Sequence, residues 1–224
     1  MQYTITRASR PLGSPTAEWN GPAWRQAETL EVTNFPWTDS GHRPVTNARL
    51  IYDDAFLAVS FRVEDRYVRA VARKFQDGVC RDSCVEFFVS PVPGSDAYFN
   101  FELNCSGTML LHRCPSTKER EEGGETLYVS DADCATVIVA HSMPQIVDPE
   151  IADPTTWTLE YHVPFALFAS YFAIDRPVSG TIWKGNVYKC GDATSHPHWG
   201  SWAPVDTPHP SFHQPAFYQP FQFA

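Results

Sequence analysis

A run of strict apolar–polar alternation in the middle of the chain constrains the fold more than any other feature. Over residues 98–104, Phe99, Phe101 and Leu103 share one side of an extended chain. The other side carries Tyr98, Asn100, Glu102 and Asn104. Because side chains alternate between the two faces of a β-strand, this pattern predicts a strand with one face in a hydrophobic core.

Short β-rich runs separated by turn residues recur along the rest of the chain. Its 19 prolines against 12 glycines favour turns and edge positions over long helices. Only two short helical turns are expected, at 24–27 and 164–170. Further strands are predicted at 49–63 (as a hairpin), 84–89, 107–112, 127–129, 135–140, 157–163, 181–190 and 216–223.

These runs predict an all-β protein, a two-sheet antiparallel β-sandwich of the jelly-roll kind with one or two short helical turns. No repeat, low-complexity tract or interdomain linker interrupts them, so a single domain over residues 1–224 is expected. The segment 115–124 is charged and ends in glycines. We expect it to be a mobile loop.

The charge balance excludes several classes of partner. A net charge of −9 is a poor match for nucleic acid or for an anionic membrane surface. No apolar run approaches the length of a membrane span, and the first residues lack a secretory signal. We expect a cytoplasmic protein or, if a signal was removed, a secreted or periplasmic one.

The six cysteines contain no C-x-x-C pair, which favours buried reduced thiols.

Polar groups on the predicted strands are the first candidates for a binding site. Asn100 and Glu102 share one strand face, and Glu86 is placed in the same manner on strand 84–89. If the two strands pair, carboxylates and amides gather on one rigid face, which suits the hydroxyl groups of a sugar. An ordinary solvated sheet face explains the same alternation.

The segment 196–215 is rich in aromatic residues, histidines and prolines. Flat rings held on a pre-ordered loop suit pyranose rings, and Trp199, Trp202 and Phe212 are the candidates. Each could equally be a core residue. The four histidines of this loop could bind zinc or copper, although the spacing of their H-x-H pair is weakly specific.

Catalytic and calcium-binding hypotheses also stay open. Glu86 and Glu102 could form the carboxylate pair of a small glycoside hydrolase. Acidic pairs in predicted turns, such as Asp53 and Asp54, could bind calcium, although no EF-hand spacing is present.

Several segments together resemble the family-nine carbohydrate-binding modules of the DOMON-like sandwich group. They are 48–65 (ARLIYDDAFLAVSFRVED), 81–89 (RDSCVEFFV), 97–104 (AYFNFELN), 157–165 (WTLEYHVPF) and the closing stretch 202–223. The resemblance covers nearly the whole chain from about Trp19 onward. The hairpin followed by D-S-x-V-E-F-F is its most specific part.

The resemblance implies a non-catalytic sandwich that binds mono- or oligosaccharides, commonly at chain ends, with structural calcium in some members. It also implies a glycoside hydrolase partner and a role in the breakdown of xylan or cellulose. One of the two tryptophans that enclose the sugar in this family has no counterpart here. By position, the implied ligand-binding residues are Glu86, Asn100, Glu102, Tyr188 and Phe212, to which the loop adds Trp202.

Our leading hypothesis is therefore saccharide binding without catalysis, with a small hydrolase as the alternative. Two other classes stay open. Related DOMON-like domains hold haem between Met and His, and an interaction sandwich without a small-molecule ligand is also compatible with the sequence.

Overall fold

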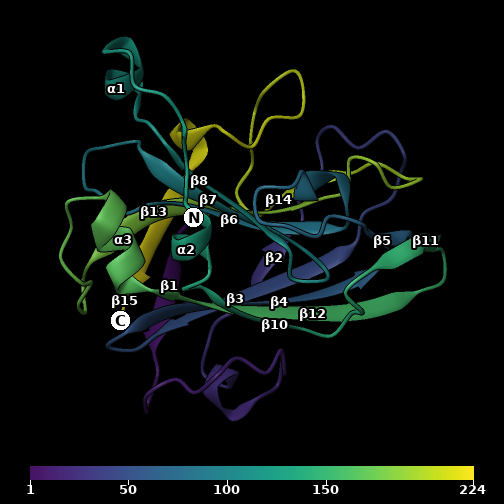
Figure 1. Ribbon diagram of the computed structural model, residues 1–224, viewed down its shortest axis with the longest axis horizontal. Helices are drawn as coiled ribbons and strands as arrows, with labels where there is room; N and C mark the ends of the chain where they lie inside the picture. Colours follow the sequence, from purple (N-terminus) through teal and green to yellow (C-terminus); the bar gives the residue numbers. More distant parts are fainter.

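The computed structural model describes residues 1–224, and it consists of two twisted β-sheets packed against each other (Figure 1). In the lower sheet of that view the strand order is β10-β12-β4-β3, with β2 added to β3. The strands of the lower sheet are β2 (Leu30–Val32), β3 (Val45–Tyr52), β4 (Phe56–Asp65), β10 (Ile138–His141) and β12 (Thr155–Pro164).

The upper sheet has the order β15-β13-β6-β7-β8-β9, with β14 paired to β13. A separate two-stranded sheet joins β5 (Val68–Ala70) to β11 (Val147–Ile151). The strands of the upper sheet are β6 (Cys84–Ser90), β7 (Tyr98–Asn104), β8 (Met109–Cys114), β9 (Leu127–Tyr128), β13 (Ile182–Cys190), β14 (Trp199–Ser201) and β15 (Gln219–Phe223).

One strand belongs to both sheets and departs from the expected antiparallel pattern. Strand β1 (Tyr3–Arg7) runs parallel to β15 through its first half and parallel to β3 through its second. It therefore closes the sandwich along one side, and Ile5 is fully buried there. This strand is not among those predicted from the sequence. Its five residues are too short a signal without the partners that pair with it.

The core lies between the inward faces of the two sheets, as the alternation predicted. Phe99, Phe101 and Leu103 of β7 are fully buried in it. Val59 and Phe61 of β4 contribute from the lower sheet. The prediction of an all-β sandwich is thus confirmed.

Helical structure is confined to short segments. The helix expected at 164–170 is α3 (Phe165–Tyr171), and the one expected at 24–27 is a 3₁₀ turn, η1 (Pro22–Trp24). Helices α1 (Thr117–Glu121) and α2 (Asp131–Cys134) were not predicted. None of the helices has the length and apolar character that crossing a membrane requires.

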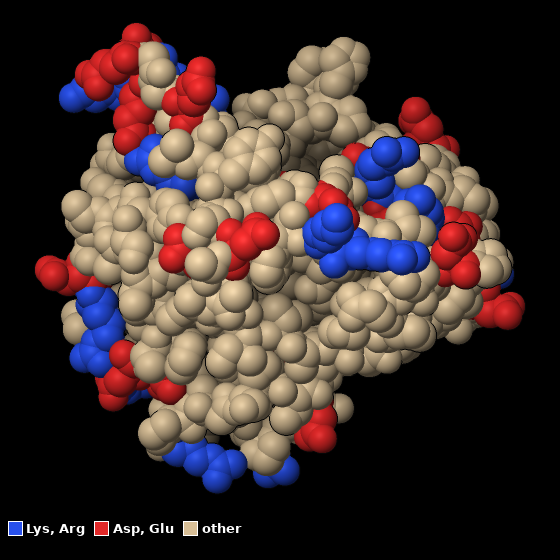
Figure 2. All heavy atoms as spheres, viewed as in Figure 1, with Lys and Arg blue, Asp and Glu red and all other residues tan.

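Helix α1 corrects the expectation of a mobile loop at 115–124. Ser116 accepts a hydrogen bond from the Glu119 backbone N–H, and Glu119 accepts one from the Ser116 backbone, which makes a capping box. Arg113 of β8 also donates to both Glu119 oxygens. The charged residues of α1 project from the molecule (Figures 1 and 2). The S-x-x-E pattern at 116–119 is the sequence signal for the start of this helix.

A buried ionic network ties β13 to β4 between the sheets. The ammonium of Lys189, with no exposed surface, lies 3.3 Å from Asp65 Oδ2 and 2.7 Å from His198 Nε2. Asp65 Oδ1 also lies 2.8 Å from His42 Nε2. Burial alone would raise the pKa of Asp65. The Lys189 charge and the His42 hydrogen bond outweigh burial and hold that pKa well below its usual range.

The Asp65→Asn variant tests how much this network contributes to the free energy of unfolding. It leaves the Lys189 ammonium buried without its carboxylate, and we expect a loss of about 3–5 kcal/mol in the free energy of unfolding. Urea unfolding followed by tryptophan fluorescence would measure it. Asp206→Asn, at an exposed position, is the matched control. An equal effect of both substitutions would contradict this account.

The acid stability of the protein should depend on His198. Burial, followed by the charge of Lys189, lowers the pKa of His198 to about 3. Its unfolded value is about 6.5. Between these two values His198 binds a proton in the unfolded chain but not in the folded protein. The free energy of unfolding therefore falls as pH drops from about 6.5 toward 3. His198 contributes a slope of up to about 1.4 kcal/mol per pH unit.

His198→Gln keeps an acceptor for Lys189 but cannot titrate. Its stability should depend less steeply on pH than that of the parent protein, whereas His209→Gln, at an exposed position of the same loop, should keep the parent slope. Unfolding curves at several pH values between 6.5 and 4.5 provide the comparison. Parallel slopes in all three proteins would refute the assignment.

Candidate functional site

A cavity of about 230 Å³ opens on the outer face of the upper sheet. Its floor is formed by β6 and β7, and loop residues Pro210 to His213 form one wall. The loop leading to β15 rises above this face in Figure 1, and the surface is hollowed beside it in Figure 2. The cavity is therefore built between a rigid sheet and a proline-rich loop.

Two carboxylates occupy the floor. Glu86 on β6 pairs in register with Glu102 on β7, so both side chains leave the same face of the sheet at adjacent positions. Such directly opposite residues have Cβ atoms about 4.5–5.5 Å apart. Both are buried, with 2% and 6% of their surface exposed. The face is therefore covered, and the alternative of a solvated sheet face is wrong for these two strands.

Asn100 holds Glu102 in place. Its Nδ2 donates to Glu102 Oε1 at 2.8 Å, and its Oδ1 accepts from the His112 backbone N–H at 2.8 Å. Asn100 is fully buried. With both ends of the amide engaged, it orients the carboxylate rather than presenting its own polar atoms to the cavity.

Burial dominates the electrostatics of the floor. It raises the pKa of Glu86 well above its ordinary value, and the Glu102 charge raises it further. Burial also raises the pKa of Glu102 to about 7, although the Asn100 hydrogen bond opposes this. Two adjacent buried carboxyls resist joint ionisation. Near neutral pH the pair therefore retains a proton and offers a hydrogen-bond donor as well as acceptors.

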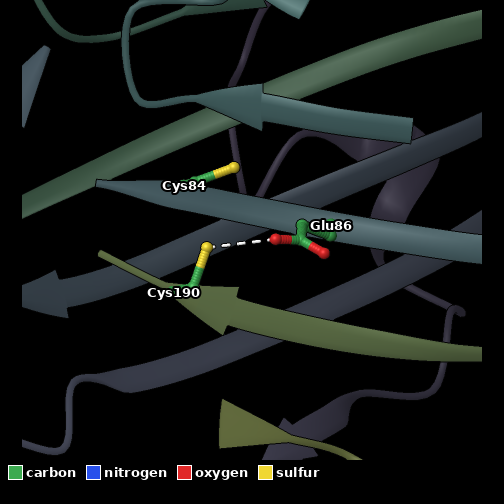
Figure 3. A group of neighbouring side chains, drawn as sticks. All are labelled: Cys84, Glu86 and Cys190. Atoms are coloured by element: carbon green, nitrogen blue, oxygen red, sulfur yellow. Dashed lines mark hydrogen bonds between the residues drawn. The ribbon is translucent and has the colours of Figure 1, made fainter. Parts of the chain in front are cut away.

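Cysteines border the two carboxylates. Cys190, at the end of β13, donates from Sγ to Glu86 Oε1 at 3.0 Å (Figure 3). Cys84 precedes Glu86 by two residues on β6 and faces the same way. Cys80 lines the cavity and is only partly buried. All the cysteines are free thiols, as expected from their scatter.

Aromatic rings form the upper part of the cavity. The Phe212 ring stacks on Tyr188 with centroids 4.2 Å apart and 15° between the planes. Tyr188 Oη also donates to the Phe212 carbonyl at 3.2 Å, which ties the loop to β13. On another side, the Trp199 indole N–H donates to Asp192 Oδ1 at 2.7 Å. Phe212 and Trp199 thus line the cavity together with the two carboxylates.

The structure brings most of the predicted residues together but not all of them. Glu86, Glu102 and Phe212 line the cavity. Asn100 and Tyr188 lie directly behind them and position them. Trp202 does not belong to this group. Its ring lies in the main core, 5.3 Å from the ring of Phe221, because it leaves the inward face of the upper sheet.

Seven of the ten residues that line the cavity were not among the predicted ligand-binding residues, and Asp192, Trp199 and His213 are three of the seven. Asp192 follows the last residue of β13 by two positions, Trp199 is the first residue of β14, and His213 follows Phe212. The aromatic loop had drawn attention to Trp199, but nothing distinguished it from Trp202. Asp192 stands alone in the sequence without any pattern around it. Only the pairing of β13 with β14 brings Trp199 to the carboxylates.

The loop histidines do not assemble a metal site. His198 is committed to Lys189, and the ring of His196 stacks on Tyr67. The one group of neighbouring side chains with metal-ligand chemistry is Cys84, Glu86 and Cys190. Asp53, one of the carboxylates considered for calcium, instead accepts three backbone N–H groups of nearby turns.

A larger cavity of about 680 Å³ lies farther along the same sheet face. It is lined by Ser90 of β6, Lys184 of β13 and Asp96, among others. Asp96 is engaged by the Thr117 backbone and hydroxyl. We favour the smaller cavity as the functional one because buried polar groups with perturbed pKa values converge only there.

The chain matches known proteins at the level of family and of fold. The family model for carbohydrate-binding family 9 matches residues 23–223. A structure from Bacteroides uniformis ATCC 8492, of a protein suspected to bind carbohydrate, is 28% identical with a TM-score of 0.87. That alignment covers 100% of this chain and 99% of that one.

Two structures of a family 9 carbohydrate-binding module from Caldicellulosiruptor kristjanssonii share the fold. The complex with cellotriose has a TM-score of 0.63 at 10% identity, covering 100% of this chain and 93% of that one. The complex with glucose has a TM-score of 0.62 at 12% identity, with 100% and 96% covered. A search of curated proteins finds no match.

Proposed function

This chain belongs to carbohydrate-binding family 9, and from that premise we propose that its cavity binds the end of a glucose-type saccharide without cleaving it. The observation that carries the proposal is the buried pair Glu86 and Glu102, which lines one cavity with the aromatic residues Phe212 and Trp199. A sugar is recognised through its hydroxyl groups and through its flat C–H faces. In this cavity the two carboxyls suit the hydroxyl groups, and the aromatic residues suit the C–H faces.

The floor suits hydroxyl groups because they both donate and accept hydrogen bonds. A carboxyl pair that retains one proton provides both functions at adjacent positions. Asn100 and Cys190 fix the two carboxyls in advance, so little order has to be created on binding. Asp192, at the rim, adds a further acceptor.

The size of the cavity supports recognition of a chain end. Its volume of about 230 Å³ lies below the roughly 300–1,000 Å³ of sites that enclose drug-sized ligands. It therefore accommodates a terminal sugar unit rather than several. The glucose and cellotriose bound by the Caldicellulosiruptor modules support a glucose-type unit, and a chain of such units points to cellulose-like material.

The hydrolase alternative finds less support in the geometry. Glycosidases place their two carboxyls on either side of the scissile bond. Glu86 and Glu102 instead rise side by side from one sheet face, on adjacent strands. A ligand lying on that face meets both from the same side.

Calorimetric titration tests the proposal. Glucose and cellobiose should bind saturably, and their reduced alditols should not if the reducing end is recognised. Glu102→Ala should weaken binding by roughly tenfold or more, because it removes hydrogen bonds from an ionisable group. Glu31→Ala, at an exposed position on β2, should leave the affinity unchanged.

Two outcomes would overturn the proposal. One is the absence of heat from every sugar with a folded protein. The other is release of reducing sugar from xylan or cellobiose that Glu86→Gln abolishes, which would establish the hydrolase.

Phe212 belongs to a second hydrophobic cluster, with Tyr188 and Tyr98, whereas Trp202 belongs to the main core, so variants at the two positions should differ in effect. Phe212→Leu keeps an apolar side chain but removes the flat face, so sugar affinity should fall several-fold while the free energy of unfolding falls by about 1 kcal/mol. Trp202→Phe should show the reverse, with lower stability and unchanged affinity, because Trp202 lies in the core. Thermal unfolding and calorimetry of both variants measure this. Unchanged affinity in folded Phe212→Leu would remove Phe212 from the site.

A further inference from the structure

A cluster of soft and acidic ligands lies at the inner end of the cavity. Cys84 and Glu86 are two residues apart on β6 and share its outer face. Cys190 on β13 lies directly opposite Cys84. Their ligand atoms, two Sγ and one carboxylate oxygen, all lie within 4.8 Å of one another (Figure 3). We propose that Cys84, Glu86 and Cys190 form a binding site for Zn²⁺.

The ligand set determines the class of ion. Thiolates select zinc and other thiophilic ions, whereas calcium and magnesium require oxygen ligands. The site is therefore different in kind from the calcium site that the sequence resemblance implied. Two sulfurs and one carboxylate give the three protein ligands typical of zinc sites that keep an open position.

The observed distances are close to those that zinc requires. Zinc lies about 2.3 Å from sulfur and about 2.0–2.2 Å from a carboxylate oxygen. Tetrahedral geometry then separates the ligand atoms by roughly 3.5–3.8 Å. Cys190 Sγ and Glu86 Oε1 are already 3.0 Å apart, and no pair exceeds 4.8 Å. Small rotations of the side chains are sufficient, and the strands that carry them are hydrogen-bonded neighbours.

An ion has both a route to the site and a favourable potential there. Glu86 and Cys190 line the cavity, so the open coordination position faces it. Glu102 and Asp192 line the same cavity and make it attractive to a cation. Binding needs no redox partner. Zinc takes a lone pair from each sulfur and from one Glu86 oxygen. The two thiol protons leave to solvent, and the proton that the Glu86–Glu102 pair retains near neutral pH leaves with them.

The same pair of thiols could instead form a disulfide, because Cys84 and Cys190 are cross-strand neighbours. Both are free in the structure. A disulfide needs an oxidant, whereas zinc binding requires only that both thiols stay reduced. The reduced full-length protein is therefore the right material for the test.

Titration with Co²⁺ as a spectroscopic probe for zinc tests the proposal. Reduced protein should bind one equivalent, with a thiolate-to-cobalt charge-transfer band that Zn²⁺ then abolishes by displacement. Cys190→Ser and Cys84→Ser should each weaken Co²⁺ binding by at least about tenfold. Cys105→Ser, which alters a buried free cysteine outside the cluster, should match the parent protein.

X-ray absorption of the zinc-loaded parent protein needs no variant and keeps the proposal testable if a serine variant fails to fold. It should show two sulfur neighbours, with lighter atoms completing the shell. The proposal is overturned by a cobalt spectrum without the charge-transfer band, by zinc bound through nitrogen and oxygen alone, or by folded Cys84→Ser and Cys190→Ser that bind as tightly as the parent. A reduced protein that binds no metal would also overturn it and would leave the disulfide as the role of the pair.

Discussion

The register among β13, β6 and β7 decides where every group of the candidate site lies. It places Glu86 opposite both Tyr188 and Glu102, and Cys84 opposite Cys190. Because side chains alternate along a strand, a slip of one residue would turn these groups into the core. The fully buried inward residues, Phe87 and Phe101 among them, prevent that slip. Burial of the inward side chains thus fixes the strand register, and the register positions the polar side chains on the opposite face of the sheet.

Strand β13 links the site to the stability of the sandwich. Tyr188 and Cys190 face outward, toward the cavity, while Lys189 between them points inward to Asp65. The buried ion pair therefore anchors the strand that supports the Phe212 ring. The loop that carries Phe212 covers the carboxylates, and this burial raises their pKa values. Burial of the two carboxyls by this loop lowers the stability of the fold. It also favours ligands that form hydrogen bonds with the buried carboxyls.

Much of this architecture could be predicted from the sequence, because long alternating strands carry a strong local signal. The strand face with Asn100 and Glu102, the inward phenylalanines and the family membership were all inferred correctly. Apart from α1, whose S-x-x-E capping signal is local, what failed depended on contacts distant in the sequence. Strand β1 exists only through β15 and β3, and Trp202 could be assigned to the core only once β14 was placed on β13.

The central claim is that the carboxylate pair Glu86 and Glu102 forms a saccharide site, and a crystal structure of the protein soaked in glucose tests it most directly. The account predicts one sugar ring in the cavity of about 230 Å³, with its hydroxyl groups hydrogen-bonded to Glu86 or Glu102 and a face against Phe212. Glucose bound only elsewhere, such as in the larger cavity near Lys184, would contradict it.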